Sequence, residues 1–260
     1  MYKYLYMAVV VLAGCAGTVE ISEKDRSAAR IQYDLGVDNF NKGNVPGALA
    51  ALSQGEKLDP TFADAHNALG LVYLALGKYE ESIGQFKRAL ELKPNWSEAR
   101  NNLGTVFMVQ KKYDLAIEQF KAAFGDVLYS TPFLAEGNLG YALYKKGDHE
   151  MGIKHIKNAT LIDAKFCRGY MWLGEIYQQE NNWRESERAL DHFIDHCVLD
   201  ASVKGQVDAT SQMEVYMRLG QIEASSGNIG RSRAGFESCL RLGQDLPYYE
   251  ACERGLKQIQ

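Results

Sequence analysis

The chain has 260 residues, of which 46% are hydrophobic and 24% are charged, an ordinary balance for a folded protein. Its 29 basic and 33 acidic residues give a formal net charge of −4, which disfavours a nucleic-acid partner because proteins that bind nucleic acid usually present a basic face. Only five prolines occur, and alanine, leucine, glutamate and lysine are common, so the composition favours helices.

Residues 1–14 have the layout of an export signal. Lys3 precedes an apolar run from Leu5 to Ala13, which is too short to span a bilayer as a permanent helix. The run ends in Leu12-Ala13-Gly14-Cys15, and small residues before a cysteine resemble the lipobox of bacterial lipoproteins. The resemblance implies that Cys15 is acylated and becomes the first residue. The alternative is an ordinary secretory signal that happens to contain a cysteine.

The residue after Cys15 predicts which membrane holds the lipid anchor. In lipoproteins of bacteria with two membranes, a non-acidic residue after the cysteine directs the protein to the outer membrane, and that residue here is Ala16. Residues 15–28 then comprise the lipidated cysteine and a polar tether. The resemblance therefore implies a protein anchored by lipid to the periplasmic face of the outer membrane.

An internal repeat runs through the rest of the chain. Leu-Gly pairs recur, and their glycines, here called the repeat glycines, are Gly36, Gly70, Gly104, Gly140, Gly174 and Gly220. Successive repeat glycines are 34, 34, 36, 34 and 46 residues apart, and 34 residues is the period of the tetratricopeptide repeat. Small residues and then large apolar residues follow in register: Ala48, Ser82 and Ala116, then Leu52, Phe86 and Phe120.

This pattern resembles the tetratricopeptide repeat and implies an all-α solenoid of stacked helix–turn–helix hairpins. We predict six repeats at about 29–62, 63–96, 97–130, 133–166, 167–200 and 213–246, with a capping helix at 247–260. The cap is expected because a last repeat would otherwise expose its apolar face. The sixth repeat matches poorly, since Glu223 occupies a position that is usually aromatic. An unrelated helical bundle, or another helical-hairpin repeat, is the alternative.

The resemblance also predicts a binding groove, because the first helices of such repeats line a concave face. The predicted groove residues are Tyr33, Val37, Phe40, Asn67, Leu71, Leu74, Asn101, Thr105, Met108, Leu134, Tyr141 and Tyr144. A contiguous apolar patch usually marks a binding surface, and Asn67 and Asn101 could hydrogen-bond the backbone of a bound peptide. The alternative is that some of these side chains pack against neighbouring helices.

Four cysteines remain after Cys15, and an even number in an exported chain suggests disulfides. Three pairings are possible. Cys167 opens the first helix of the fifth repeat and Cys197 closes its second helix, so these ends are neighbours in an antiparallel hairpin. We therefore prefer Cys167–Cys197, with Cys239 of the last repeat bonded to Cys252 of the capping helix. Unpaired buried thiols are the alternative.

Signs of catalysis are absent from the sequence. No phosphate-binding loop, no His-Glu-x-x-His and no Gly-x-Ser-x-Gly occurs, and no nucleophile stands with a base. His192 and His196 are four residues apart and could share a metal, but we interpret them as a surface pair. We therefore predict no enzyme activity, no cofactor, no metal and no small-molecule substrate.

A lipobox followed by about six tetratricopeptide repeats resembles the pilotins of type IV pilus systems, the PilF/PilW/Tgl-type lipoproteins. The resemblance is carried by Leu12-Ala13-Gly14-Cys15, by the junction Asp59-Pro60-Thr61-Phe62-Ala63-Asp64-Ala65-His66 and by Asn101-Asn102-Leu103-Gly104. The insertion from Phe124 to Phe133, with Tyr129-Ser130-Thr131-Pro132, also matches a segment that interrupts the repeats of these pilotins. The implied function is to bind secretin subunits and promote their insertion and multimerisation in the outer membrane. The alternative is a scaffold for another envelope machine, such as cell division or polysaccharide export.

Overall fold

The computed structural model of the chain describes residues 21–200, 202 and 207–259. Within these residues it contains thirteen α-helices, one π-helix and no strand. The helices are α1 (Glu23–Asn41), α2 (Val45–Leu58), α3 (Ala63–Ala75), α4 (Tyr79–Leu92), α5 (Ser97–Val109), α6 (Tyr113–Phe124), α7 (Pro132–Lys146), α8 (His149–Ile162), α9 (Cys167–Gln179), α10 (Trp183–Phe193), η1 (Ile194–Leu199), α11 (Ala209–Ser225), α12 (Ile229–Leu240) and α13 (Tyr249–Gln258). The predicted signal peptide at 1–14 and Cys15 lie outside the described residues.

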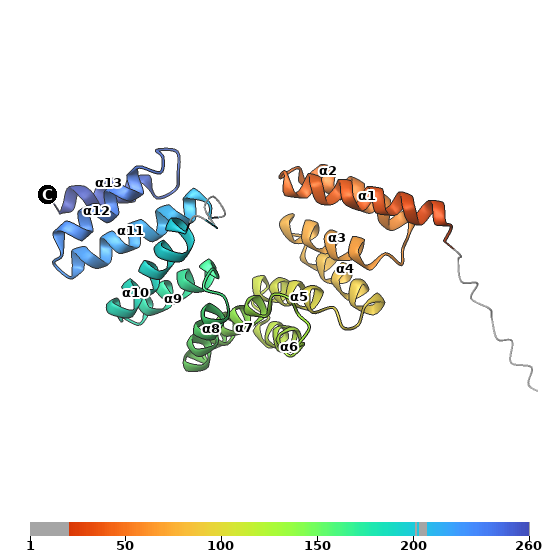
Figure 1. The fold of residues 1–260 in the computed structure, drawn as a ribbon, viewed down its shortest axis with the longest axis horizontal. Helices are drawn as coiled ribbons and strands as arrows, with labels where there is room; N and C mark the ends of the chain where they lie inside the picture. Colours follow the sequence, from red (N-terminus) through yellow and green to blue (C-terminus); the bar gives the residue numbers. More distant parts are fainter. Residues whose placement is uncertain (1–20, 201, 203–206, 260) are drawn as a thin grey trace, which may run out of the picture.

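The helices form six antiparallel hairpins that stack in chain order. Each odd-numbered helix from α1 to α11 pairs with the even-numbered helix that follows it, and each hairpin contacts the next. Figure 1 shows the stack bending into an open arc, with α5 on the inner side of α6 and α9 on the inner side of α10. The contacts of α1 with α3, α3 with α5 and α5 with α7 line up the odd-numbered helices along one side of the stack. The predicted all-α solenoid of helical hairpins is confirmed.

The repeat glycines explain why each hairpin closes tightly. A Cβ atom placed on Gly70 would lie 2.6 Å from the ring of Phe86, and one on Gly104 would lie 2.6 Å from the ring of Phe120. Both rings are fully buried. The large side chain of the outer helix therefore fills the space that the missing side chain of the inner helix leaves, as close packing requires.

Three hairpins add a hydrogen bond to this contact. The buried hydroxyls of Ser82, Ser186 and Ser232 donate to the carbonyl oxygens of the repeat glycines Gly70, Gly174 and Gly220, at 2.7, 2.7 and 2.8 Å. Each bond joins residues twelve apart. A serine at this position thus satisfies its own buried hydroxyl while it remains small enough for the helices to touch.

Two helices begin earlier than the sequence pattern predicts. Helix α1 begins at Glu23, so the last part of the expected tether at 15–28 is helical. The Ser22 hydroxyl caps this helix by accepting from the Asp25 N–H at 3.1 Å, and Glu23 and Asp25 place negative charge in its first turn. Helix α11 begins at Ala209, where the Asp208 carboxylate accepts from the Ser211 N–H at 2.9 Å. Capping, which lies outside the repeat pattern, sets both starts.

The C-terminal part of the solenoid carries two disulfides. Cys167 is bonded to Cys197, with their Cα atoms 5.8 Å apart, and Cys239 is bonded to Cys252, with 6.3 Å between Cα atoms. These are the two pairs preferred above from the positions of the cysteines in their helices. The first bond joins the start of α9 to the π-helix η1, and the second joins α12 to α13. Helix α13 covers the last hairpin, where Phe236, Met213 and both cysteines of the second bond are buried together.

Candidate partner-binding groove

The inner face of the arc is formed by α1, α3, α5, α7, α9 and α11 (Figure 1). The first four of these helices contact one another in sequence, α1 with α3, α3 with α5 and α5 with α7. Contacts between α7 and α9 and between α9 and α11 are sparser. The inner helices therefore approach one another most closely in the N-terminal half.

In the N-terminal half, most predicted groove residues are partly buried and partly accessible. Tyr33 meets the edge of Phe62 with 5.2 Å between ring centroids, and Tyr33 and Phe40 both pack on the core of the first two repeats. Leu71, Leu74 and Met108 pack on the core of the next two. The remaining half-buried members are Val37, Thr105 and Leu134. This stretch offers apolar surface without a deep cavity.

The two asparagines predicted to bind a peptide backbone are engaged inside the protein. Asn67 and Asn101 are only 6% and 7% exposed. The Asn102 amide donates to the Asn67 side-chain oxygen at 3.2 Å, and the Asn138 amide donates to the Asn101 side-chain oxygen at 2.9 Å. Their oxygens thus hold successive inner helices together, and the burial of both side chains corrects the expectation that they hydrogen-bond the backbone of a bound peptide.

Tyr144 is a second correction. It is 7% exposed and stacks on His149 with 4.4 Å between ring centroids, in the core between α7 and α8. Burial first, and then the negative charge of Glu180, raise the pKa of its hydroxyl. Tyr144 therefore belongs to the core of its hairpin. Its neighbour in the predicted set, Tyr141, remains half-buried at the inner face.

Tyr141 belongs to an aromatic pair whose other member, Trp172, is not among the predicted groove residues. It stacks face to face on Trp172 of α9, with 4.4 Å between centroids and 6° between ring planes. Lys145 lies 5.0 Å from the Tyr141 ring centroid, and Arg168 lies 5.9 Å from that of Trp172. The inner face of repeats 4 and 5 therefore carries two stacked aromatic rings with a cation beside each.

A cavity of about 400 Å³ opens beside Trp172, between α9 and α11. Met171, Trp172 and Arg168 line it from α9, and Val215 and Arg218 line it from α11. Buried side chains of α10 form its floor, among them Leu190 and Phe193. This cavity has an apolar base and a charged rim.

One position of the repeat predicts which side chains link neighbouring inner helices. Asn102, Asn138, Trp172 and Arg218 all stand two residues before a repeat glycine, and each reaches back to the preceding inner helix. Arg218 does so through the Gln178 side chain. The position therefore links neighbouring inner helices. The predicted groove residues stand at other positions of the repeat, so the pattern that predicts them does not include Trp172.

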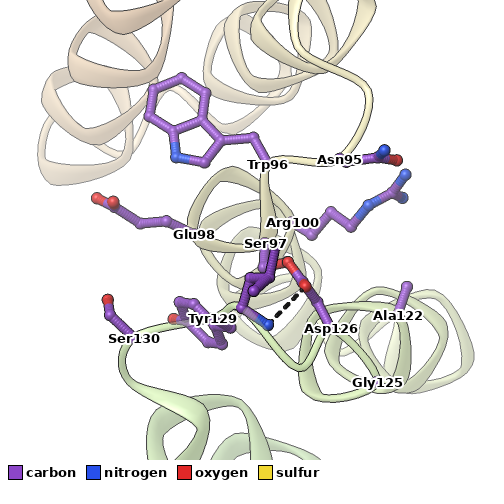
Figure 2. Close-up of a pocket in the computed structure, with 11 residues that line it drawn as sticks. Asn95, Trp96, Ser97, Glu98, Arg100, Ala122, Gly125, Asp126, Tyr129 and Ser130 are labelled. Atoms are coloured by element: carbon purple, nitrogen blue, oxygen red, sulfur yellow. Dashed lines mark hydrogen bonds between the residues drawn. The ribbon is translucent and has the colours of Figure 1, made fainter.

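A larger hollow of about 700 Å³ lies at the edge of the solenoid, between the start of α5 and the insertion that joins α6 to α7. Figure 2 shows Trp96, Arg100, Asp126 and Tyr129 around it. The Ser97 hydroxyl first, and then the Leu128 N–H, donate to Asp126 and lower the pKa of its carboxyl. Two adjacent apolar side chains of the insertion are almost fully exposed, Val127 at 96% and Leu128 at 88%. The insertion thus adds an apolar tip to this edge.

The histidine pair on the outer side is stacked with a tyrosine. The rings of His192 and His196 are 5.8 Å apart between centroids, and Tyr170 lies 5.7 and 5.9 Å from them. Within residues 21–200, 202 and 207–259, no group of three or more His, Cys, Asp or Glu side chains could hold a metal ion. In the same residues, no helix is long and apolar enough to cross a membrane.

Comparison with known repeat families identifies the class of repeat. Sequence models of the tetratricopeptide repeat match residues 33–97 and residues 137–166. Together with the stacked hairpins, these matches show a tetratricopeptide-repeat solenoid. No curated protein sequence matches the chain.

Three solved structures of other proteins are similar to this chain over most of its length. The structure of PilF from Pseudomonas aeruginosa is 17% identical in sequence, with a TM-score of 0.69 over 89% of this chain and 99% of that one. The structure of PilW, a type IV pilus biogenesis factor, is 18% identical, with a TM-score of 0.71 over 89% and 97%. A chain of the APC/C hetero-tetramer Cut9–Hcn1 is 16% identical, with a TM-score of 0.69 over 91% of this chain and 43% of that one. At these identities the likeness shows the fold alone.

Proposed function

We propose that the chain is a non-catalytic, protein-binding lipoprotein of a type IV pilus system, which promotes the localisation of a secretin to the outer membrane and its multimerisation there. The observation that carries the proposal is the extent of the likeness to PilF and PilW, which spans 89% of this chain and nearly all of each of theirs. The larger Cut9–Hcn1 chain is matched over only 43% of its length. This chain and the pilus proteins are thus alike along nearly their whole length.

The concave inner face supports the binding part of the proposal. Arrays of helical hairpins present extended concave surfaces that bind segments of other proteins. Here that surface carries half-buried apolar side chains, including Leu71, Leu74 and Met108, and ends in the cavity beside Trp172. Because insertion of a pore into the membrane buries apolar surface, assembly requires no nucleotide from this protein.

The lipid on Cys15 is the second part of the proposal. Each buried methylene of an acyl chain contributes about 0.8 kcal/mol, so a multiply acylated cysteine anchors a protein stably. With Ala16 after it, the anchor places the solenoid on the periplasmic face of the outer membrane, where secretin subunits arrive. This position and the groove together would hold subunits at the membrane that they enter.

Deletion of the gene tests the function. We expect secretin subunits to remain monomeric and pili to be lost, and we expect a plasmid copy of the gene to restore both. The measurement is the amount of secretin multimer in membrane fractions, separated by gel electrophoresis without boiling. Normal secretin multimers in the deletion strain would refute the pilotin role and leave the protein as a scaffold of another envelope machine.

Two neighbouring substitutions test the anchor. Cys15→Ala should release the protein from the membrane fraction, because no acyl chain can be attached. Ala16→Asp should keep the protein in membranes but retain it in the inner membrane, because an acidic residue after the cysteine opposes export to the outer one. Ala16→Ser is the control and should fractionate as the wild type does. Unchanged fractionation of Cys15→Ala would show that the protein is held in another way.

A further inference from the structure

Apolar side chains underlie the cavity between α9 and α11, and charged and polar side chains of both helices surround it. Val215 is 1% exposed, and Leu190 and Phe193 are fully buried, so these side chains close the base of the cavity and add almost no accessible surface. Met171 forms the side toward α9. Methionine adapts its shape to different apolar partners. A volume of about 400 Å³ accommodates a large apolar side chain together with part of its backbone.

Trp172 forms a rigid wall of this cavity. Its indole is stacked on Tyr141 at 4.4 Å between ring centroids, and the edge of Phe166 meets it at 5.9 Å. The ring is therefore held in place before any partner arrives, while part of it stays accessible. A preorganised tryptophan beside an apolar pocket has the properties of an interface hot spot, because little side-chain freedom is lost on binding.

Among the described residues around the cavity, one cation, Arg168, and one carboxylate, Asp208, form no ion pair. Glu214 pairs with Arg218 at 2.7 Å, and Glu175 pairs with Lys145 at 3.8 Å. Asp208 accepts from the Ser211 hydroxyl at 2.7 Å and caps α11. Arg168 is exposed, lies beside the Trp172 ring, and forms no ion pair within the described part of the chain.

Lys145 remains a cation on the other side of the aromatic stack. Burial by itself lowers the pKa of its ammonium group, but the hydrogen bond with Tyr141 and the charge of Glu175 outweigh burial and raise it. The Lys145 ammonium pairs with Glu175, whereas the Arg168 guanidinium forms no ion pair among the described residues and can bind a carboxylate of a partner. Arg168 is therefore the cation beside Trp172 that a carboxylate of a partner can reach.

We propose that the cavity between α9 and α11 binds an extended segment of a partner protein in which a large apolar residue lies next to an aspartate or glutamate. The apolar side chain enters the cavity against Trp172 and Met171, and the neighbouring carboxylate pairs with Arg168. A guanidinium beside an aromatic ring is well suited to this contact, because its planar fork can bind a carboxylate in a bidentate manner. The inference rests on the proposed protein-binding role, but it does not require that the partner be a secretin.

The test is selection of a displayed library of short random peptides on the full chain, purified without its signal peptide. We expect selected peptides to combine Leu, Met, Phe or Trp with a neighbouring Asp or Glu. Their dissociation constants should rise by about tenfold or more with Arg168→Glu or Trp172→Ala. Selected peptides that lack an acidic residue, or a selection that yields no binding peptide, would overturn the proposal.

Matched variants on the outer helix provide the controls. Trp183 and Arg184 stand at the exposed start of α10, so Trp183→Ala and Arg184→Glu should leave the affinities unchanged. A charge exchange makes the test specific: peptides in which the acid is replaced by lysine should bind Arg168→Glu better than they bind the wild type. Equal affinity of the peptides for the wild type and Arg168→Glu would refute the carboxylate contact, even if secretin assembly depends on this protein.

Discussion

At the scale of single residues, the repeat glycines matter because they have no side chain. Gly70 faces the buried ring of Phe86, and a Cβ atom there would lie 2.6 Å from it. Gly84, on the outer helix of the same hairpin, has nothing within 4 Å of such an atom. The two glycines are 14 residues apart in the sequence and differ only in what surrounds them.

Substitution of these glycines should have opposite effects. Gly70→Ala should destabilise the protein by about 1–3 kcal/mol, because it overpacks a closed contact. Gly84→Ala should stabilise it by about 0.5–1 kcal/mol, because alanine is the better helix former. Thermal and urea unfolding followed by circular dichroism measures both. A shift of the same sign for the two variants would contradict the packing argument.

Glu223 is an acid in a position where the repeat pattern favours an aromatic residue. It is 4% exposed, and its Oε1 lies 2.7 Å from Nη1 of Arg231 without the alignment of a hydrogen bond. Burial first, and then the neighbouring Glu187, raise the pKa of Glu223 above its ordinary value of 4.5 despite the charge of Arg231. The folded protein therefore holds this proton more tightly than the unfolded chain does.

The sign of the resulting pH dependence follows from linkage. A raised pKa in the folded state stabilises the protein below the unfolded value near 4.5, and this contribution is lost as pH rises through the folded value. Glu223→Gln, which resembles the protonated form, should therefore be more stable than the wild type at neutral pH and equal to it in acid. Exposed Glu237→Gln is the control. A pH-independent difference in melting temperature between Glu223→Gln and the wild type would refute the assignment.

At the scale of elements, the turns inside the six hairpins share one backbone conformation. The residue seven positions after each repeat glycine has a φ between 58° and 108°, in the left-handed region. Four of these residues are glycines, and the other two are Lys111 and Asn181. Left-handed φ is costly for a lysine and less so for an asparagine. The turn geometry therefore persists even where the sequence does not favour it.

Replacing these two residues by glycine should stabilise the turns to different extents. Lys111→Gly should raise the free energy of unfolding by about 0.5–1 kcal/mol, because it relieves backbone strain. Asn181→Gly should have a smaller effect, since asparagine tolerates the left-handed region better. Urea unfolding of the two variants and the wild type measures the difference. Destabilisation by Lys111→Gly would show that the lysine side chain contributes more than its backbone strain costs.

At the scale of the whole molecule, stability is distributed along the stack. Each hairpin packs mainly on its neighbours, so the energy of the array approximates a sum of local terms. The two disulfides lie in the last two repeats and the cap, where the match to the repeat pattern is poorest. They constrain a part of the solenoid whose inner helices approach one another less closely than those of the N-terminal half.

Removal of the second disulfide should therefore act locally. Cys239→Ala combined with Cys252→Ala opens a loop closed over 13 residues, which should cost about 3 kcal/mol. Hydrogen exchange should accelerate in α11, α12 and α13 and remain unchanged in α1 to α6. The pair Cys167→Ala and Cys197→Ala is the comparison and should accelerate exchange in α9, α10 and η1. Uniform acceleration along the chain would contradict the additive picture.

The sequence by itself determined the all-α fold class and its stacked helical hairpins. These features depend on contacts within one hairpin, between residues about 12 to 16 apart such as Gly70 with Ser82 and Phe86, so a regular spacing of small and large residues reports them. The early starts of α1 and α11 depend on capping side chains that the repeat pattern does not contain.

Only the tertiary structure decided which side chains face the groove. Asn67 and Asn101 are engaged by Asn102 and Asn138, which are 35 and 37 residues further along the chain, and the accessible aromatic surface is formed instead by Trp172 stacked on Tyr141. These contacts join successive repeats, and their geometry depends on how one hairpin is rotated against the next. A spacing pattern within each repeat carries no information about that rotation, so it could not separate the buried Asn67, Asn101 and Tyr144 from the partly accessible members of the predicted set.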